Sequence, residues 1–312
     1  MDKRGGNRKD AFRKTHVCDS PARRSAILQA RGGWAQNARM SSLSADSIQP
    51  APPAAAPANP RDHVESFARG LAILCAFGPD RPKMTLSDAA RVTGLQRSAA
   101  RRFLLTLCDL GYAVQTDRWF ALTPRVLELG YAYLGSLRFP ELIEPYLTGL
   151  TRELGESSSA AVLDGTDIVY VARSAAPQRL MALSLGVGTR LPAHATSMGQ
   201  ALLATLSDDE VRARYGRAPL QGFTPATITD VGRLLERLAT VRRDGFALND
   251  QELEFGLRSV AVAVPGKGQR QAVALNVATN AARVSHEEVM RRILPAIREA
   301  AAQCARAVAL LG

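Results

Sequence analysis

The stretch TLSDAARVTGLQRSAARRFLLTLCDLGYAVQTDRWFALTP, residues 85–124, decides the fold of the first domain. Its opening tetrapeptide TLSD has the form of a capping box and predicts a short helix that Thr93 and Gly94 end. A second helix follows, because five apolar residues recur on one face at helical spacing: Ala100, Phe103, Leu104, Leu107 and Leu110. Two short helices joined by a tight turn that contains glycine are typical of a helix-turn-helix.

The opposite face of the second helix carries Ser98, Arg101 and Arg102. In a helix-turn-helix, the early positions of this helix reach the edges of the bases. We expect Arg101 or Arg102 to pair with guanine, while Arg97 and Ser98 hold phosphate. The alternative is a surface helix with solvated arginines.

Residues 112–124, YAVQTDRWFALTP, predict two short strands around a turn, and a hairpin directly after such a helix is a wing. Arg118 at its tip is expected to contact backbone phosphate or the minor groove; a solvated turn arginine is the alternative. Upstream, residues 64–77, VESFARGLAILCAF, predict a further helix. Its apolar stripe, which needs a packing partner, consists of Val64, Phe67, Leu71, Leu74 and Cys75.

Positive charge is concentrated toward the N-terminus. Residues 1–60 hold 10 basic against 4 acidic side chains, residues 61–138 hold 11 against 7, and residues 139–312 hold 19 against 18. This distribution suits a polyanion-binding module attached to a neutral domain. We interpret residues 1–60 as a disordered basic tail, rich in Pro and Ala from Pro50 to Pro60, that is more a solubilising arm than a DNA contact. Met40 is a candidate translation start.

Residues 61–123 thus form the predicted DNA-binding domain, and residues 124–138 follow as a linker helix. Pro124 suits the first position of a helix, and the sequence after it is apolar on most sides. We expect this helix to be buried against its own copy in a homodimer, which would read a palindromic operator. A core helix buried within one chain is the alternative.

Residues 139–312 mix helical and extended patterns, which predicts an α+β fold. Two strands flank an Asp164-Gly165 turn, residues 179–185 are a further strand, and residues 256–279 are a long hairpin. Helices are expected near residues 140–154, 197–206, 208–215 and 230–243, with a last one capped at Ser285. The expected architecture is an antiparallel sheet with helices to one side.

Several classes of function are disfavoured. The four cysteines are scattered singly and the four histidines form no close pair, so a metal site is not expected. There is no stretch of about 20 apolar residues that would span a membrane and no signal-peptide pattern, which indicates a cytoplasmic protein without membrane contact. The glycine pairs at residues 186–188 and 266–268 are interpreted as turns. We expect no cofactor.

The sequence resembles the IclR family of bacterial transcriptional regulators over residues 64–311. The resemblance rests on the winged helix-turn-helix, the linker helix, and the motifs GTRLPAHATSMGQALLA and FALNDQELEFGLRSVAVAV, at residues 188–204 and 246–264. The motifs ARRFLLTL and GTRLPAHATSMG look most like the branch that governs aromatic-acid catabolism through protocatechuate, para-hydroxybenzoate and β-ketoadipate. The resemblance implies a GAF-like effector domain, a homodimer or a dimer of dimers, operator DNA, a small carboxylate effector and, as a further candidate partner, RNA polymerase.

The resemblance also implies where the effector binds. The matching positions lie in three segments, and the residues are Ala193, Ala195, Asn249, Leu257, Ser259 and Asn276. Small and apolar residues leave room for a ring, while Asn and Ser orient polar groups. An acidic ligand also needs a cation, and the nearest in the sequence are Arg190, His194 and Arg258.

One alternative from another class is a hydrolytic or metabolite-binding protein with a solubilising tail. The segment Ala195–Gly199 nearly matches the G-x-S-x-G nucleophile elbow, and His194 lies beside it. However, Ala195 replaces the glycine that the strained turn needs, and Ser197 suits the N-cap of the next helix. We therefore expect no enzyme and no catalytic residue.

Overall fold

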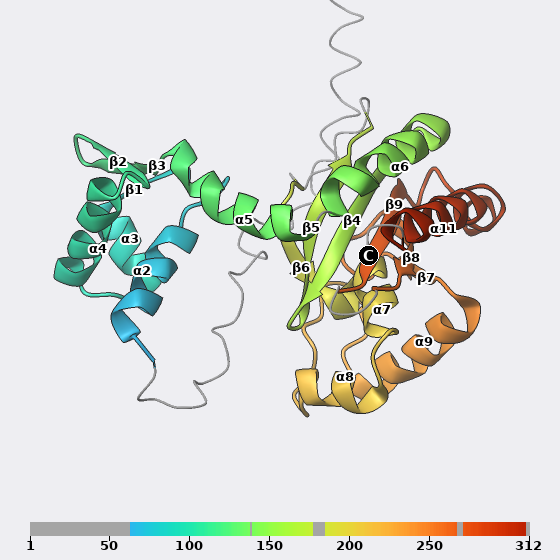
Figure 1. Cartoon of the computed structure of the whole chain (residues 1–312). Coiled ribbons are helices and arrows are strands. Elements are labelled where there is room, and N and C mark those ends of the chain that lie inside the picture. The colour runs from blue at the N-terminus through green and yellow to red at the C-terminus, as the bar shows by residue number, and fades with distance from the viewer. Residues whose placement is uncertain (1–62, 138, 177–184, 267–270, 310–312) are drawn as a thin grey trace, which may run out of the picture. The chain divides into compact units, whose positions relative to one another are not determined.

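The structure, a computed structural model, describes residues 63–137, 139–176, 185–266 and 271–309 (Figure 1). The predicted tail with Met40 and most of the strand expected at residues 179–185 lie outside these ranges.

The first folded unit contains three helices and three strands. In chain order they are α2 (Glu65–Cys75), β1 (Lys83–Thr85), α3 (Leu86–Thr93), α4 (Arg97–Asp109), β2 (Ala113–Thr116) and β3 (Trp119–Leu122). The strands form one antiparallel sheet in the order β1-β3-β2. This is the winged helix-turn-helix that the sequence predicts.

Local signals in the sequence place α3 and α4. The Thr85 hydroxyl accepts a hydrogen bond from the Asp88 amide, the Asp88 carboxylate accepts one from the Thr85 amide, and Gly94 ends α3 with φ 68°. This closes the predicted capping box. The predicted face of α4 is buried at Ala100, Leu104 and Leu107, but Leu110 follows the last turn and is exposed.

The apolar stripe of α2 does not lie where its periodicity suggests. Val64, Phe67 and Leu71 are exposed, Phe67 to 67%, and the residue that α2 buries in the small core is Ile73. A helix with two apolar faces buries one in its own domain. Of the stripe, Leu74 packs against this core, and Val64, Phe67 and Leu71 are left exposed.

After a short 3-10 turn at Pro124–Val126, helix α5 spans Leu127–Leu137. Leu127, Leu129 and Tyr131 are exposed, the last to 76%, whereas Leu134 is half-buried against the core of the C-terminal domain. Leu134 thus packs within the chain while the other three side chains are exposed, and the homodimer and the buried core helix both remain predictions.

The effector domain is built on a six-stranded antiparallel sheet in the order β6-β5-β4-β9-β8-β7 (Figure 1). The strands are β4 (Ser157–Asp164), β5 (Asp167–Ser174), β6 (Arg190–Pro192), β7 (Ala247–Asp250), β8 (Leu257–Val264) and β9 (Val273–Asn280). The hairpins predicted around residue 164 and across residues 256–279 are confirmed.

Both faces of this sheet are covered, so the expectation of helices on one side is wrong. One face packs on α6 (Phe139–Leu154) and α11 (Leu294–Ala309), and the other on α7 (Ser197–Leu203) and α9 (Val231–Asp244). The remaining helical segments are η5 (Ala193–Ala195), α8 (Asp208–Tyr215), α10 (His286–Glu288) and the π-helical turn η6 (Val289–Ile293).

The reason lies in the strands themselves. Seven consecutive residues of β4 are buried, from Ser157 to Leu163, and β9 is nearly as continuous. A strand buried on both faces has an unbroken run of small and apolar residues in place of an alternation. The sequence of β4, SSSAAVLD, already shows that run.

Helix α7 approaches the preceding turn so closely that only glycine fits at position 199. A Cβ on Gly199 would lie 2.1 Å from the carbonyl oxygen of Ala193. The contact is with backbone, which cannot move without shifting η5.

We expect Gly199→Ala to lower the free energy of unfolding of the effector domain by about 3 kcal/mol or more, because overpacking forces backbone shifts. Gly149→Ala is the matched control. Its Cβ meets nothing within 4 Å on the exposed face of α6, so it should be neutral or stabilising. Urea unfolding of both variants measures the difference, and equal stability would show that α7 can move away.

Candidate functional site

The first half of α4 presents the residues predicted to contact DNA. Arg97, Ser98, Arg101 and Arg102 are all exposed. In the described part of the chain, no carboxylate forms an ion pair with these three arginines. Their charges are therefore available to a polyanion.

The wing adds a second cationic site. The guanidinium of Arg118 lies 5.4 Å from the ring centroid of Trp119, and the ammonium of Lys83 lies 5.0 Å from the same ring. Such cation-π contacts hold flexible cations in place. Arg118 was a predicted DNA contact, whereas Lys83 was not, because only the pairing of β1 with β3 places it beside Trp119.

The effector domain contains a cavity between the sheet and the start of α7. It has a volume of about 20 Å³, enough for roughly one water molecule. The sheet contributes Ser159, Tyr170, Arg173, Leu191, Asn249, Leu257, Ser259, Asn276 and Ala278 to its wall. The other lining residues are Leu185, Ala195, Thr196, Ser197, Met198 and Leu253.

Of the residues that the resemblance implies for the effector, five line this one cavity: Ala195, Asn249, Leu257, Ser259 and Asn276. They come from η5, β7, β8 and β9, which are far apart in the sequence. Ala193 is fully buried beneath α7 and does not reach the wall.

The three cations expected for an acidic ligand do not line the cavity. Arg190 donates to Asp164 and Asp167 at the tip of the β4-β5 hairpin. Arg258 forms an ion pair with Asp250 and donates to the carbonyl of Val284.

His194 points elsewhere as well. Its Nε2 lies 2.9 Å from the carbonyl oxygen of Gln221, and its ring contacts Tyr215 and Phe223. Burial lowers the pKa of His194 below its usual value of 6.5, so the ring is neutral at pH 7. It is therefore a core residue and not a charge for the ligand.

The cation that does line the cavity is Arg173, which the sequence analysis missed. Strict alternation along β5 would put Arg173 on the face opposite Tyr170. However, Tyr170 pairs with Ala161 and Ala172 pairs with Ala160, so that Val171 is an extra residue in a β-bulge. A bulge reverses the alternation beyond it and thereby turns Arg173 toward the cavity.

Two hydrogen bonds fix the wall opposite Arg173. The amide of Asn249 donates to the carbonyl of Ala195 at 3.0 Å, and the hydroxyls of Ser197 and Ser259 lie 2.8 Å apart. These contacts tie η5 and α7 to the sheet across the cavity.

The same hydrogen bonds correct the prediction for Ser197. The N-cap of α7 is Thr196, whose hydroxyl accepts from the amide of Gly199, while the Ser197 side chain turns to Ser259. Neither Ser197 nor His194 contacts the other in the way a nucleophile and its base must. The two residues are structural.

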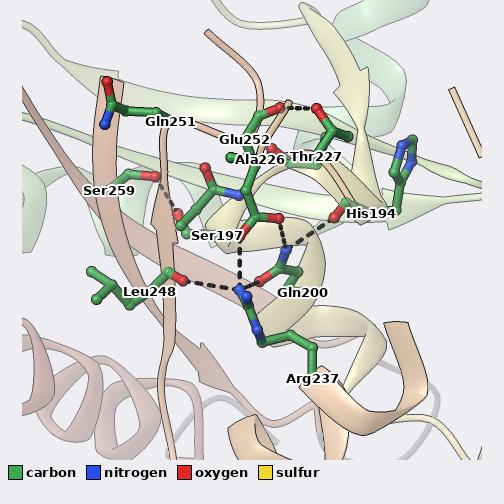
Figure 2. A network of polar contacts seen from close by, with 12 residues as sticks. His194, Ser197, Gln200, Ala226, Thr227, Arg237, Leu248, Gln251, Glu252 and Ser259 are labelled. Atoms are coloured by element: carbon green, nitrogen blue, oxygen red, sulfur yellow. Dashed lines mark hydrogen bonds and ion pairs between the residues drawn. The ribbon is translucent and has the colours of Figure 1, made fainter. Parts of the chain in front are cut away.

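A buried polar network supports the cavity wall from behind (Figure 2). Gln200 on α7 donates to the carbonyl of His194 and to Glu252, and Glu252 forms an ion pair with Arg237 of α9 at 2.7 Å. The Thr227 hydroxyl donates to the Glu252 carbonyl. Burial raises the pKa of Glu252, and Arg237 opposes that shift.

A winged helix-turn-helix joined to an α+β domain with a cavity between its sheet and a helix is the architecture of a class of protein, the ligand-responsive transcriptional regulators. No helix of the described chain is long and apolar enough to cross a membrane. The models for the IclR helix-turn-helix domain and for the C-terminal domain of the bacterial transcriptional regulator IclR match residues 66–117 and 131–306.

Two relatives and two solved structures show the same likeness. The chain is 42% identical to the Pca regulon regulatory protein of Pseudomonas putida over 234 residues, 75% of this chain and 80% of that one. It is 39% identical to the p-hydroxybenzoate hydroxylase transcriptional activator of Acinetobacter baylyi over 248 residues, 77% of this chain and 90% of that one.

The crystal structure of a transcriptional regulator from Rhodococcus sp. RHA1 matches with 46% identity and a TM-score of 0.70, over 80% of this chain and 100% of that one. An IclR homologue from Microbacterium hydrocarbonoxydans, complexed with 4-hydroxybenzoate, matches with 25% identity and a TM-score of 0.68, over 78% of this chain and 99% of that one. The chain belongs to the IclR family: it is a ligand-responsive, DNA-binding transcriptional regulator and not an enzyme.

The network predicts a pH-dependent cost of removing Arg237. Arg237→Met leaves the Glu252 carboxylate buried without its ion-pair partner, which typically costs about 3–5 kcal/mol. A carboxyl group whose pKa is raised in the folded state makes the protein less stable as pH rises through that pKa. The free energy of unfolding lost in Arg237→Met should therefore be larger at pH 7 than at pH 4.5. Urea unfolding at both pH values measures it.

The double variant Arg237→Met with Glu252→Gln is the control, because it removes the charge that was left unpaired. It should recover part of the loss at pH 7 and show no such pH dependence. A cost of Arg237→Met that is equal at both pH values would contradict the role of Glu252.

Proposed function

We propose that this protein controls a catabolic operon by binding a small aromatic acid in the cavity beneath α7, with Arg173 holding the carboxylate. One observation carries the proposal. Among the described residues that line the cavity, Arg173 is the one with a charged side chain, and no described carboxylate forms an ion pair with it. A buried or half-buried guanidinium without an anion is suited to bind a carboxylate in bidentate geometry.

The relatives support the class of ligand. The homologue from Microbacterium hydrocarbonoxydans was solved with 4-hydroxybenzoate, and the Acinetobacter baylyi relative is an activator of p-hydroxybenzoate hydroxylase by name. The walls of the cavity suit a ring, since Tyr170, Leu191 and Met198 are apolar or aromatic and almost fully buried. The chromosome is the target, so we place the protein in the cytoplasm.

The exposed apolar surfaces support a homodimer. The stripe of α2, at Val64, Phe67 and Leu71, and the exposed side chains of α5 are apolar surface that a monomer leaves in water. A second copy would cover them by two-fold symmetry and give two recognition helices for a palindromic operator. Residues 63–123 would then read DNA, α5 would link the subunits, and residues 139–309 would hold the effector.

The switch follows from differential binding. An acid that binds one arrangement of the effector domain more tightly shifts the population toward it. A coupling of about 1–3 kcal/mol between effector and operator is enough for regulation. The direction of the response, repression or activation, belongs to the operator and to contacts with RNA polymerase.

The role of Arg173 is tested by Arg173→Met, which keeps most of the side-chain volume and removes the charge. Since hydrogen bonds to a charged group contribute about 1.5–3 kcal/mol, affinity for 4-hydroxybenzoate or protocatechuate should fall roughly 10- to 100-fold. Isothermal titration calorimetry measures this loss, and operator binding without ligand should be unchanged.

Arg190→Met is the matched control, because Arg190 is paired with Asp164 and Asp167 outside the cavity. Its affinity for the acid should remain near that of the wild type. If both variants bind equally well, the carboxylate is held elsewhere.

The DNA contact is tested by Arg101→Ala and Arg102→Ala. At least one should cost about 1–3 kcal/mol of operator affinity and relax the preference for one base pair. Arg243→Ala removes the same charge from an exposed site in the effector domain and should have little effect. Fluorescence anisotropy at two salt concentrations measures all three, and equal losses would mean that only net charge matters.

A further inference from the structure

The three-stranded sheet of the wing has one buried face and one outer face. Met84 on β1 and Phe120 on β3 pair with each other and are buried in the small core of this unit. Side chains alternate along a strand, so the preceding residues, Lys83 and Trp119, lie on the outer face. The pairing of β1 with β3 thus brings a lysine and a tryptophan together on the surface.

Arg118 joins this pair from the turn between β2 and β3. Its guanidinium lies 5.4 Å from the ring centroid of Trp119, and the ammonium of Lys83 lies 5.0 Å from the same centroid. Both cations are exposed, whereas Trp119 is half-buried. A ring that is partly anchored in the sheet therefore holds two long cationic side chains that solvent would otherwise leave free to move.

The turn that carries Arg118 is itself held in place. Thr116 pairs with Trp119, so the turn has two residues, and the first of them, Asp117, has φ 53°. Aspartate is one of the residues that tolerate this left-handed conformation. The side-chain amide of Gln115 donates to the carbonyl of Asp117 at 2.8 Å. These contacts fix the backbone from which Arg118 extends.

The positive charges of Lys83 and Arg118 are not neutralised by the described chain. The ion pairs described in residues 63–137 involve other side chains than these two. The cation-π contact between Arg125 and Tyr112 differs in this respect, because Arg125 also pairs with Glu128. Cations that are held in place and lack a counter-ion are suited to bind a polyanion.

We propose, resting on the proposed reading of operator DNA by α4, that Trp119 is a positioning residue whose ring holds Lys83 and Arg118 against two phosphates of the DNA backbone. The strand that carries Lys83 leads directly into α3, the first helix of the helix-turn-helix. Phosphate contacts fix the position of a protein on the duplex and carry no sequence information directly. The wing thus contributes affinity, while α4 contributes the choice of sequence.

Trp119→Leu tests this role, because it removes the ring and leaves the net charge unchanged. The probe is a labelled duplex that the wild type selects from a random pool, titrated with the full-length protein at several salt concentrations. Two cation-π contacts are lost, so affinity should fall roughly 5- to 25-fold. The slope of log affinity against log salt concentration should become shallower by about 1–2, since each phosphate contact contributes about 0.9.

Two further variants separate positioning from folding. Trp119→Tyr keeps an aromatic face and a side chain that suits a strand, so it should bind within about twofold of the wild type. In a protein that already carries Lys83→Met and Arg118→Met, adding Trp119→Leu should cause no further loss, because the ring has no cation left to hold.

Tyr112→Leu is the matched control in the same unit. It removes a ring from Arg125, whose guanidinium is already used by Glu128 and by the carbonyl of Leu110. Affinity for the duplex and its salt slope should both stay near the wild-type values. Thermal unfolding of both leucine variants checks that the unit remains folded.

A second duplex, with one base pair of the selected sequence changed, distinguishes phosphate contacts from base contacts. Trp119→Leu should weaken both duplexes by the same factor. Arg101→Ala or Arg102→Ala should change the ratio of the two affinities.

Several results would overturn the role of Trp119 and leave the regulator intact. They are an unchanged salt slope in Trp119→Leu, an equal loss when Lys83 and Arg118 are already replaced, or an equal loss in Tyr112→Leu. Each of these would mean that the ring supports the fold or contacts DNA itself. If the wild type selects no duplex, the proposed function fails and the role of Trp119 fails with it.

Discussion

The effector domain depends on one constraint: its central sheet is covered on both faces, so each polar side chain on it must find a partner inside the protein. Burying an unpaired polar group is costly, and most of these groups are paired. Ser158 bonds Thr151 and the backbone of α6 on one face, while Ser259 and Asn249 bond α7 and η5 on the other. These bonds hold the helices in register with the strands. Among the described residues, the Oδ1 atom of Asn276 is the one buried side-chain polar atom without a partner, and Arg173 donates only to Ser159.

The fold of the DNA-binding unit could be predicted from its sequence because local interactions determine its helices. The capping box at Thr85, the glycine at position 94 and the periodicity of α4 are each decided within a few residues. The same rules located α8, whose capping box at Ser207 is formed as expected. Periodicity could not say what covers an apolar face, however. The stripe of α2 packs on its own core only at Leu74, whereas Val64, Phe67 and Leu71 are exposed.

Only some residues of the cavity could be predicted from the sequence, because segments that are far apart in the chain form its wall. Sequence proximity pointed to Arg190 and Arg258, but aspartates on neighbouring strands pair with both. Arg173 was not predicted because a single bulged residue, Val171, decides whether the Arg173 side chain lies on the same face of the sheet as Tyr170. No propensity rule predicts a bulge of this kind. A continuous apolar run such as β4 did contain the signal for cover on both faces, and the prediction of helices on one side overlooked it.

The size of the cavity bears on the proposed switch. A space of about 20 Å³ holds one water molecule and not a ring, so a bound acid requires a wider arrangement than the present one. The Ser197–Ser259 and Asn249–Ala195 hydrogen bonds join α7 and η5 to the sheet, so a widening between these elements would break them. Each such bond contributes about 0.5–1.5 kcal/mol, which is the magnitude of a regulatory coupling. Gln200, Glu252 and Arg237 connect α7 to α9, so a displacement of α7 would also change these contacts. In the proposed switch, the free energy of binding an acid would be set against these contacts, and a ligand that favours one of two arrangements shifts the population toward it.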